Sequence, residues 1–207
     1  MLSWQRIQDD YLCSACRKEF VRLTGSTCPG CGRKWPELCP DCRRWRSQQP
    51  SLLCNRALYA YNNAMRTYMQ RYKFQGDYRL RRVFSDELQT ALTKWYPRWQ
   101  GWIYVPLPVD DITWQTRGFN QVVGFLSGIA IKEGLMMIPS CHQKQSTKTR
   151  TARLQTKQPF QAKPSAARFA RVVLVDDVYT TGRTLYHARK ALTAVGVQHI
   201  RSVTLAR

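Results

Sequence analysis

The strongest constraint on the fold of this chain lies in residues 172–184, which read VVLVDDVYTTGRT. The run Val172–Val175 is short, apolar and rich in β-branched residues, as expected of a strand buried inside a parallel sheet. Two adjacent carboxylates, Asp176 and Asp177, follow this run, and a polar loop comes after them. Apolar residues then recur at helical spacing, at Leu185, Ala188, Leu192 and Val195. This order predicts a strand, a tight loop and a helix of an α/β fold.

The loop after this strand also has the groups that bind a sugar phosphate. Backbone N–H groups of such a loop, and of the helix N-terminus behind it, can hold a phosphate group. Gly182 allows the backbone to come close to a ligand, and Asp176 and Asp177 can accept hydrogen bonds from ribose hydroxyls. Further donors are the hydroxyl groups of Thr180, Thr181 and Thr184. Asp-Asp pairs are common in turns, but the complete order is similar to the 5-phosphoribosyl-1-pyrophosphate (PRPP) loop of type I phosphoribosyltransferases.

Three C-x-x-C pairs stand near the N-terminus: Cys13/Cys16, Cys28/Cys31 and Cys39/Cys42. Disulfides are disfavoured in the cytosol, and two such pairs complete a tetrahedral zinc site. Three pairs leave one over after a single site. The two closest pairs, Cys28/Cys31 and Cys39/Cys42, are the first choice as ligands, and Cys13/Cys16 with Cys28/Cys31 is the alternative. The expected zinc ion is structural, because no pattern of an acid with a histidine accompanies these cysteines.

The chain is strongly basic, since 33 Lys and Arg against 13 Asp and Glu give a formal net charge of +20. A surplus of this kind favours polyanions, because a nucleic acid releases counterions when basic side chains bind it. The sequence has no apolar run of about 18 residues, so no membrane span is expected. Asp9 and Asp10 do not suit a secretory signal. We therefore expect a cytoplasmic protein that contacts nucleic acid.

The remaining segments predict further helices and strands. Apolar residues at helical spacing predict helices within 59–74, 83–95 and 122–130, and short apolar runs predict strands at 102–108 and 200–205. Two prolines end the strand at 102–108, whose carboxyl end should lie beside the loop after Asp177. Residues 143–168 predict a loop or linker. Its basic residues, which could close over a pyrophosphate or follow a nucleic-acid backbone, are Lys144, Lys148, Arg150 and Arg153.

Together with the cysteine pairs, several strings make nearly the whole chain resemble the ComF family of competence proteins. These strings are YKFQGD at 72–77, VPLP at 105–108, RGFNQ at 117–121, the Thr- and Arg-rich segment at 147–154, and VDDVYTTG at 175–182. The resemblance implies a type I phosphoribosyltransferase-like parallel sheet flanked by helices over 56–207. It also implies a small N-terminal zinc-finger module with four cysteine ligands over 1–55.

This resemblance implies a role in natural transformation, the uptake of DNA, with single-stranded DNA and a DNA helicase of the competence machinery as partners. It also implies a PRPP pocket, in which Asp176 and Asp177 serve catalysis and take the ribose hydroxyls, directly or through Mg²⁺. The implied PRPP-binding residues are Val105, Pro106, Leu107, Pro108, Arg117, Asp176, Asp177, Thr180, Thr181, Gly182, Arg183 and Thr184. The alternatives are an active phosphoribosyltransferase of nucleotide salvage and, more weakly, an interaction adaptor with a vestigial pocket.

Overall fold

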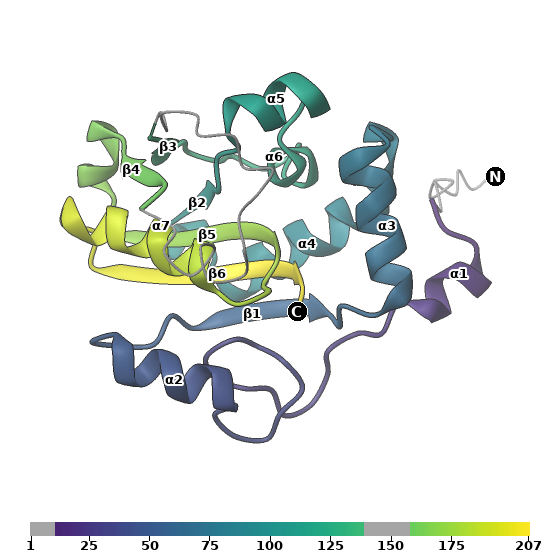
Figure 1. The fold of residues 1–207 in the computed structure, drawn as a ribbon, viewed down its shortest axis with the longest axis horizontal. Coiled ribbons are helices and arrows are strands. Elements are labelled where there is room, and N and C mark those ends of the chain that lie inside the picture. Colours follow the sequence, from purple (N-terminus) through teal and green to yellow (C-terminus); the bar gives the residue numbers. More distant parts are fainter. Residues whose placement is uncertain (1–10, 139–157) are drawn as a thin grey trace, which may run out of the picture.

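A four-stranded parallel sheet forms the centre of the structure, a computed structural model that describes residues 11–138 and 158–207 (Figure 1). The strands lie in the order β1 (Asn55–Tyr59), β6 (His199–Ala206), β5 (Arg171–Val178) and β2 (Trp102–Pro106). β5 has a neighbour on each side, and its residues 172–175 are fully buried, which explains the continuous apolar run. The predicted α/β class is confirmed, as are the strands predicted at 102–108, 172–175 and 200–205.

Three helices cover one face of the sheet: α3 (Asn63–Phe74), α4 (Arg82–Trp95) and α6 (Gln121–Phe125). α3 begins where the side chain of Asn62 accepts a hydrogen bond from the backbone N–H of Met65 at 3.0 Å. Its aromatic and methionine stripe is buried against the sheet, so this stripe forms core, as predicted. Within the parts of the chain that the structure describes, no helix has the length and apolar character needed to cross a membrane.

The opposite face carries α7 (Arg183–Ala194), the antiparallel pair β3 (Leu135–Met137) and β4 (Phe160–Ala162), and the cysteine segment with α2 (Pro40–Gln48). Strand alternation divides β5 between the two layers, since Val172 and Leu174 face α7 whereas Val173 and Val175 face α3 and α4. In Figure 1, α2 lies beyond the edge strand β1. The cysteine segment shares one hydrophobic core with α7 and therefore packs directly on the α/β unit.

The remaining elements are α1 (Ser14–Glu19), α5 (Asp111–Arg117) and the short 3₁₀ helices η1 (Tyr78–Arg81), η2 (Arg98–Gln100) and η5 (Pro164–Arg168). Phe20, which follows α1, packs edge-on against Phe84 of α4 with ring centroids 5.0 Å apart. Arg17 of α1 forms an ion pair with Glu87 of α4 at 3.1 Å. α1 is therefore attached to the layer formed by α3 and α4.

The helix predicted within 59–74 is confirmed as α3, which begins after the cap residue Asn62, because Tyr59 is the last residue of strand β1. The helix expected over 122–130 ends at Phe125, because the chain turns tightly there. In this turn, Leu126 accepts hydrogen bonds from the backbone N–H groups of Gly128 at 2.9 Å and Ile129 at 3.2 Å.

The segment predicted as a loop or linker at 143–168 is partly ordered into elements. Residues 160–162 form β4 and residues 164–168 form η5. Its four basic residues, Lys144, Lys148, Arg150 and Arg153, lie outside the described residues. The domain boundary expected after residue 55 stays a prediction, and β1 begins at that residue.

Candidate functional site

Strand β5 brings the two predicted carboxylates to the carboxyl edge of the sheet, where ligands bind in open α/β sheets. Asp177 is only 4% exposed and forms an ion pair with Nζ of Lys73, at the end of α3. Asp176 is half-buried, and its Oδ1 accepts a hydrogen bond from the backbone N–H of Asp177 at 2.9 Å. The role of Lys73 was missed, because nothing in the string around it signals a contact with a distant carboxylate.

The electrostatics of this strand end favour a cationic or hydrogen-bond-donating ligand. Burial raises the pKa of the Asp176 carboxyl, and the charge of Asp177 raises it further, whereas Lys73 acts in the opposite direction. A carboxylate in such a place is stabilised by additional donors or positive charge. Ribose hydroxyls, or the waters of a hydrated Mg²⁺ ion, would supply both.

Residues 180–184, here called the Thr-Gly loop, connect β5 to α7. Gly182 has φ +83°, in the left-handed region, and directly precedes the first residue of α7. A Cβ atom at this position would collide with the ring and hydroxyl of Tyr179, which lies buried under the loop. The hydroxyl-bearing residues Thr180, Thr181 and Thr184 are exposed. The loop therefore presents hydroxyls and a helix N-terminus to solvent on a fixed backbone turn.

A tryptophan of the cysteine segment supports this loop from α2. The indole Nε1 of Trp45 donates a hydrogen bond to the carbonyl oxygen of Thr181 at 2.8 Å. The same ring stacks on Tyr186 of α7, with centroids 4.0 Å apart and planes 18° apart. Sequence reasoning missed Trp45, since an isolated tryptophan among basic residues shows no pattern that points to a loop far along the chain.

The C-terminal residue joins the same support. The guanidinium of Arg207 lies 4.9 Å from the ring centroid of Tyr179, and its Nη1 donates to the Tyr179 carbonyl at 3.3 Å. Its Nη2 lies 3.6 Å from a carboxylate oxygen of Asp41 in α2. The end of β6, helix α2 and the residue beneath the Thr-Gly loop are thus connected by hydrogen bonds and ion pairs.

The residues predicted to lie near pyrophosphate divide into two groups. Val105 and Leu107 are buried in the core, where the Leu107 N–H donates to the Val175 carbonyl at 3.0 Å and extends the pairing of β2 with β5. The other three line a surface cavity of about 870 Å³, here called the aromatic hollow. These lining residues are Pro106, Pro108 and Arg117.

Arg117 is held in place by other residues of the sequence motifs that resemble the ComF family. Its Nε donates to the carbonyl of Lys73 at 2.9 Å, and its Nη1 donates to the side chain of Gln121. Asn120 caps α6 through the N–H groups of residues 122 and 123 and donates to the Leu107 carbonyl at 2.8 Å. The hydroxyl of Tyr72 donates to the carbonyl of Gln121 at 2.9 Å. These hydrogen bonds therefore connect α3, β2 and α6 around the carboxyl edge of the sheet.

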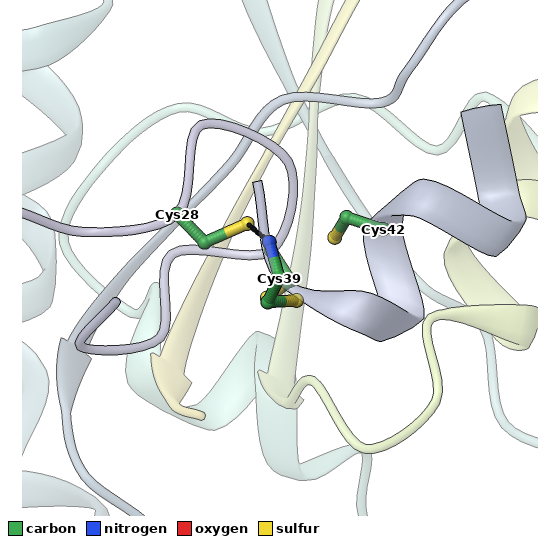
Figure 2. A group of neighbouring side chains, drawn as sticks. Cys28, Cys39 and Cys42 are labelled. Carbon is green, nitrogen blue, oxygen red and sulfur yellow. Dashed lines mark hydrogen bonds between the residues drawn. The ribbon is translucent and has the colours of Figure 1, made fainter. Parts of the chain in front are cut away.

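Four buried cysteines come together, and their sulfur atoms all lie within 4.8 Å of one another. These are Cys28, Cys31, Cys39 and Cys42, the first-choice ligand set, and they are here called the cysteine cluster. Figure 2 shows three of them, Cys28, Cys39 and Cys42, with Cys42 on α2. Two zinc-bound sulfurs at ~2.3 Å from a tetrahedral ion would stand about 3.8 Å apart. The Sγ atoms of Cys31 and Cys39 are 3.6 Å apart, so the cluster has the size and donor set that could hold a zinc ion.

The thiols of this cluster influence one another strongly. A hydrogen bond from Cys42 lowers the pKa of the Cys31 thiol, and Arg207 contributes in the same direction. The interaction with Cys31 and burial in turn raise the pKa of Cys42, and burial raises that of Cys39. Four thiolates at this spacing require a cation, because like charges repel in a buried site.

The alternative ligands Cys13 and Cys16 are not part of this cluster. Both side chains are exposed at the start of α1, where Cys13 Sγ accepts a hydrogen bond from the Cys16 N–H at 3.4 Å. α1 packs on the α3 and α4 layer, whereas the cluster packs on the layer of α7. The structure thus brings together only two of the three C-x-x-C pairs.

The parallel sheet, the acidic end of β5 and the Thr-Gly loop ahead of α7 define a phosphoribosyltransferase-type domain. Residues 134–207 match the family model described as "Phosphoribosyl transferase domain". The chain is 33% identical to the competence protein ComFC of Streptococcus pneumoniae, over 98% of this chain and 90% of that protein. It is 34% identical to ComFC of Bacillus subtilis over 96% of this chain and 85% of that protein. The chain belongs to the ComFC family, as its sequence strings predict.

A more distant relative matches this chain over a similar share of its length. Competence protein F of Haemophilus influenzae is 26% identical over 95% of this chain and 90% of that protein. The similarity therefore spans the cysteine segment as well as the phosphoribosyltransferase-type domain in all three relatives.

Proposed function

We propose that this chain is a competence protein that handles single-stranded DNA during natural transformation and binds PRPP at the carboxyl edge of its sheet. The names of the relatives support the competence role. The proposal that PRPP binds rests on the junction of β5 and α7. There, two carboxylates precede a loop with a left-handed glycine and a helix N-terminus.

In the proposed complex, the 5-phosphate of PRPP binds the Thr-Gly loop. The exposed hydroxyls and the N–H groups at the start of α7 are the donors, and the helix dipole favours the negative charge. The ribose hydroxyls bind Asp176 and Asp177, directly or through a hydrated Mg²⁺ ion. When bound, Mg²⁺ would offset the charge of the pyrophosphate group.

The pyrophosphate group lies on the β2 side of the pocket in this proposal. Pro106, Pro108 and Arg117 line the aromatic hollow next to the end of β2, and β2 pairs with β5. The Arg117 guanidinium is oriented by the Lys73 carbonyl and the Gln121 side chain, which leaves its charge at the rim of the hollow. A positioned arginine suits the phosphate oxygens of the ligand.

A structural zinc ion bound by the cysteine cluster completes the proposal. The four buried sulfurs are close enough for tetrahedral coordination, and α2 connects them to the Thr-Gly loop through Trp45. Zinc would thus stabilise the segment that supports the phosphate end of the pocket.

Single-stranded DNA is the proposed macromolecular partner, since the net charge of +20 exceeds what one PRPP molecule needs. A DNA helicase of the competence machinery and a cytoplasmic location belong to the same proposal. Both rest on the role that the names of the relatives indicate.

Calorimetry with PRPP and Mg²⁺ tests the pocket. Wild-type protein is expected to release or absorb binding heat, and the double variant Asp176→Asn/Asp177→Asn is expected to show none. Asp86→Asn removes an exposed carboxylate of α4 and is expected to bind like the wild type. Unchanged binding by the double variant would contradict the assignment of the two carboxylates to the PRPP pocket.

A titration with a single-stranded oligonucleotide at several salt concentrations tests the DNA function. Affinity should fall steeply as salt rises, because the basic surface replaces condensed counterions. Absent binding at low salt, or binding that ignores salt, would remove DNA from the proposal and leave the PRPP pocket standing.

A further inference from the structure

The aromatic hollow contains more apolar surface than a pyrophosphate group would use. It measures about 870 Å³ and is lined by residues from η1, α5, α6, β3 and the end of β2. Three of its lining residues are aromatic: Tyr78, Trp114 and Phe119. Trp114 is 57% exposed and Tyr78 is 40% exposed, although burial of such rings is strongly favourable.

The aromatic rings form a partly preorganised surface. The rings of Tyr78 and Phe119 have centroids 4.8 Å apart, and Phe119 also contacts Tyr72 of the core at 5.2 Å. The guanidinium of Arg81 lies 4.1 Å from the Tyr78 ring centroid, in a cation–π contact. A planar ligand that enters the hollow therefore meets two rings, Tyr78 and Phe119, that other side chains already contact.

The charge around the hollow is mainly positive. Arg117 and Lys163 line it, and Glu133, the one acidic lining residue among those that the structure describes, is paired with Lys163 at 2.5 Å. Arg79 and Arg81 of η1 follow Tyr78 in sequence, and Arg79 forms an ion pair with Asp77 at 3.5 Å. A partner with a negative backbone and flat apolar faces matches this combination of cations and exposed rings.

We propose that the aromatic hollow receives an unstacked base of single-stranded nucleic acid, with Trp114 and Tyr78 as the stacking surfaces and the strand backbone on the basic side chains around the hollow. This inference rests on the single-stranded DNA part of the proposed function, and it adds the place where a base is bound. Stacking on these rings needs no specific base, because every base has a π-face.

Two strands of equal length and charge separate base stacking from phosphate attraction. An oligothymidylate has bases, and an abasic strand of the same length has only the backbone. Wild-type protein should bind the oligothymidylate about fivefold or more tightly than the abasic strand, the size of one stacked base. Equal affinities of the wild type for both strands would overturn the base site.

Variants at two exposed tryptophans locate the effect. Trp114→Ala should abolish most of the preference for the strand with bases, whereas Trp114→Phe, which retains a ring, should keep most of it. Trp99→Ala removes an 83% exposed tryptophan of η2, ahead of the amino end of β2, and should bind both strands like the wild type. A preference that survives in Trp114→Ala, or that disappears in Trp99→Ala, would contradict the assignment to the hollow.

The same titrations separate this proposal from the proposed function. If both strands bind with equal, salt-sensitive affinity, the DNA function stands and the base site fails. If neither strand binds at low salt, both fail, and the outcome of PRPP calorimetry then stands alone.

Discussion

The Thr-Gly loop and the aromatic hollow lie at the same edge of the sheet, but they are built in different ways. The loop is one contiguous segment whose backbone turn depends on Gly182 and whose support comes from Tyr179 and Trp45. The hollow takes its residues from five separate elements and presents exposed rings rather than hydroxyls. The loop suits a small ligand of fixed shape, whereas the hollow suits any planar group.

This difference predicts that the two functions can be separated by mutation. Changes that disturb the support of the Thr-Gly loop should weaken PRPP binding and spare the binding of single-stranded DNA. Changes in the exposed rings of the hollow should weaken the binding of single-stranded DNA and leave Arg117 and the Thr-Gly loop to bind PRPP. Four predictions test the loop half of this comparison.

The largest effect is expected from Cys39→Ser, which removes a proposed ligand of the cysteine cluster at the start of α2. Structural zinc contributes directly to folding, so we expect loss of the ion and a destabilisation of about 3 kcal/mol or more. Native mass spectrometry and thermal unfolding measure both. Cys54→Ser, at a half-buried cysteine outside the cluster, is the matched control. A Cys39→Ser protein that keeps its metal and its unfolding midpoint would contradict the assignment of the cluster.

Gly182→Ala should have the next largest effect, and this effect should be confined to the loop. The left-handed backbone at this position is unfavourable for alanine, and the new Cβ atom meets the Tyr179 side chain, so about 1–3 kcal/mol of strain is expected, or about fivefold and more in PRPP affinity. Gly196→Ala is the control, because Gly196 also has a positive φ of +94° but open space around it. Equal PRPP affinity of the two variants, measured by calorimetry, would show that the loop does not bind the ligand.

Trp45→Ala should weaken PRPP binding by a smaller amount. It removes the hydrogen bond to the Thr181 carbonyl and the stack on Tyr186, together worth about 1–2 kcal/mol. Part of this loss should appear as a several-fold weaker PRPP affinity, while the affinity for single-stranded DNA stays the same. An unchanged PRPP affinity in a folded Trp45→Ala protein would mean that α2 does not support the loop.

The smallest effect is expected from Cys13→Ser/Cys16→Ser. Both side chains are exposed on α1, away from the loop and its support, so unfolding free energy should change by less than ~0.5 kcal/mol. Zinc content and PRPP affinity should equal those of the wild type. Loss of a metal ion from this variant would restore the alternative ligand set.

Much of the loop side of the site could be predicted because its information is local. The apolar run 172–175, the two carboxylates and Gly182 are adjacent in the chain, and the rules for strands, turns and helix starts apply to them directly. The cysteine knuckles are local for the same reason. Which two C-x-x-C pairs come together depends on the tertiary structure, and the sequence alone did not decide it.

The residues that were missed act across long separations. Lys73 reaches Asp177 from the end of α3, and Trp45 reaches Thr181 from α2. Strand β1 was not predicted from the sequence, because it directly precedes the aromatic stretch that continues into α3. The aromatic hollow was not predicted for a related reason, since Tyr78 and Trp114 come to line one cavity only in the folded chain.

The most direct test of the central claim is a crystal structure of the protein with PRPP and Mg²⁺. We expect the 5-phosphate on the Thr-Gly loop, the ribose hydroxyls at Asp176 and Asp177, and one zinc ion among the four sulfurs of the cysteine cluster. A PRPP molecule bound elsewhere, or a zinc ion held by Cys13 and Cys16, would contradict this expectation.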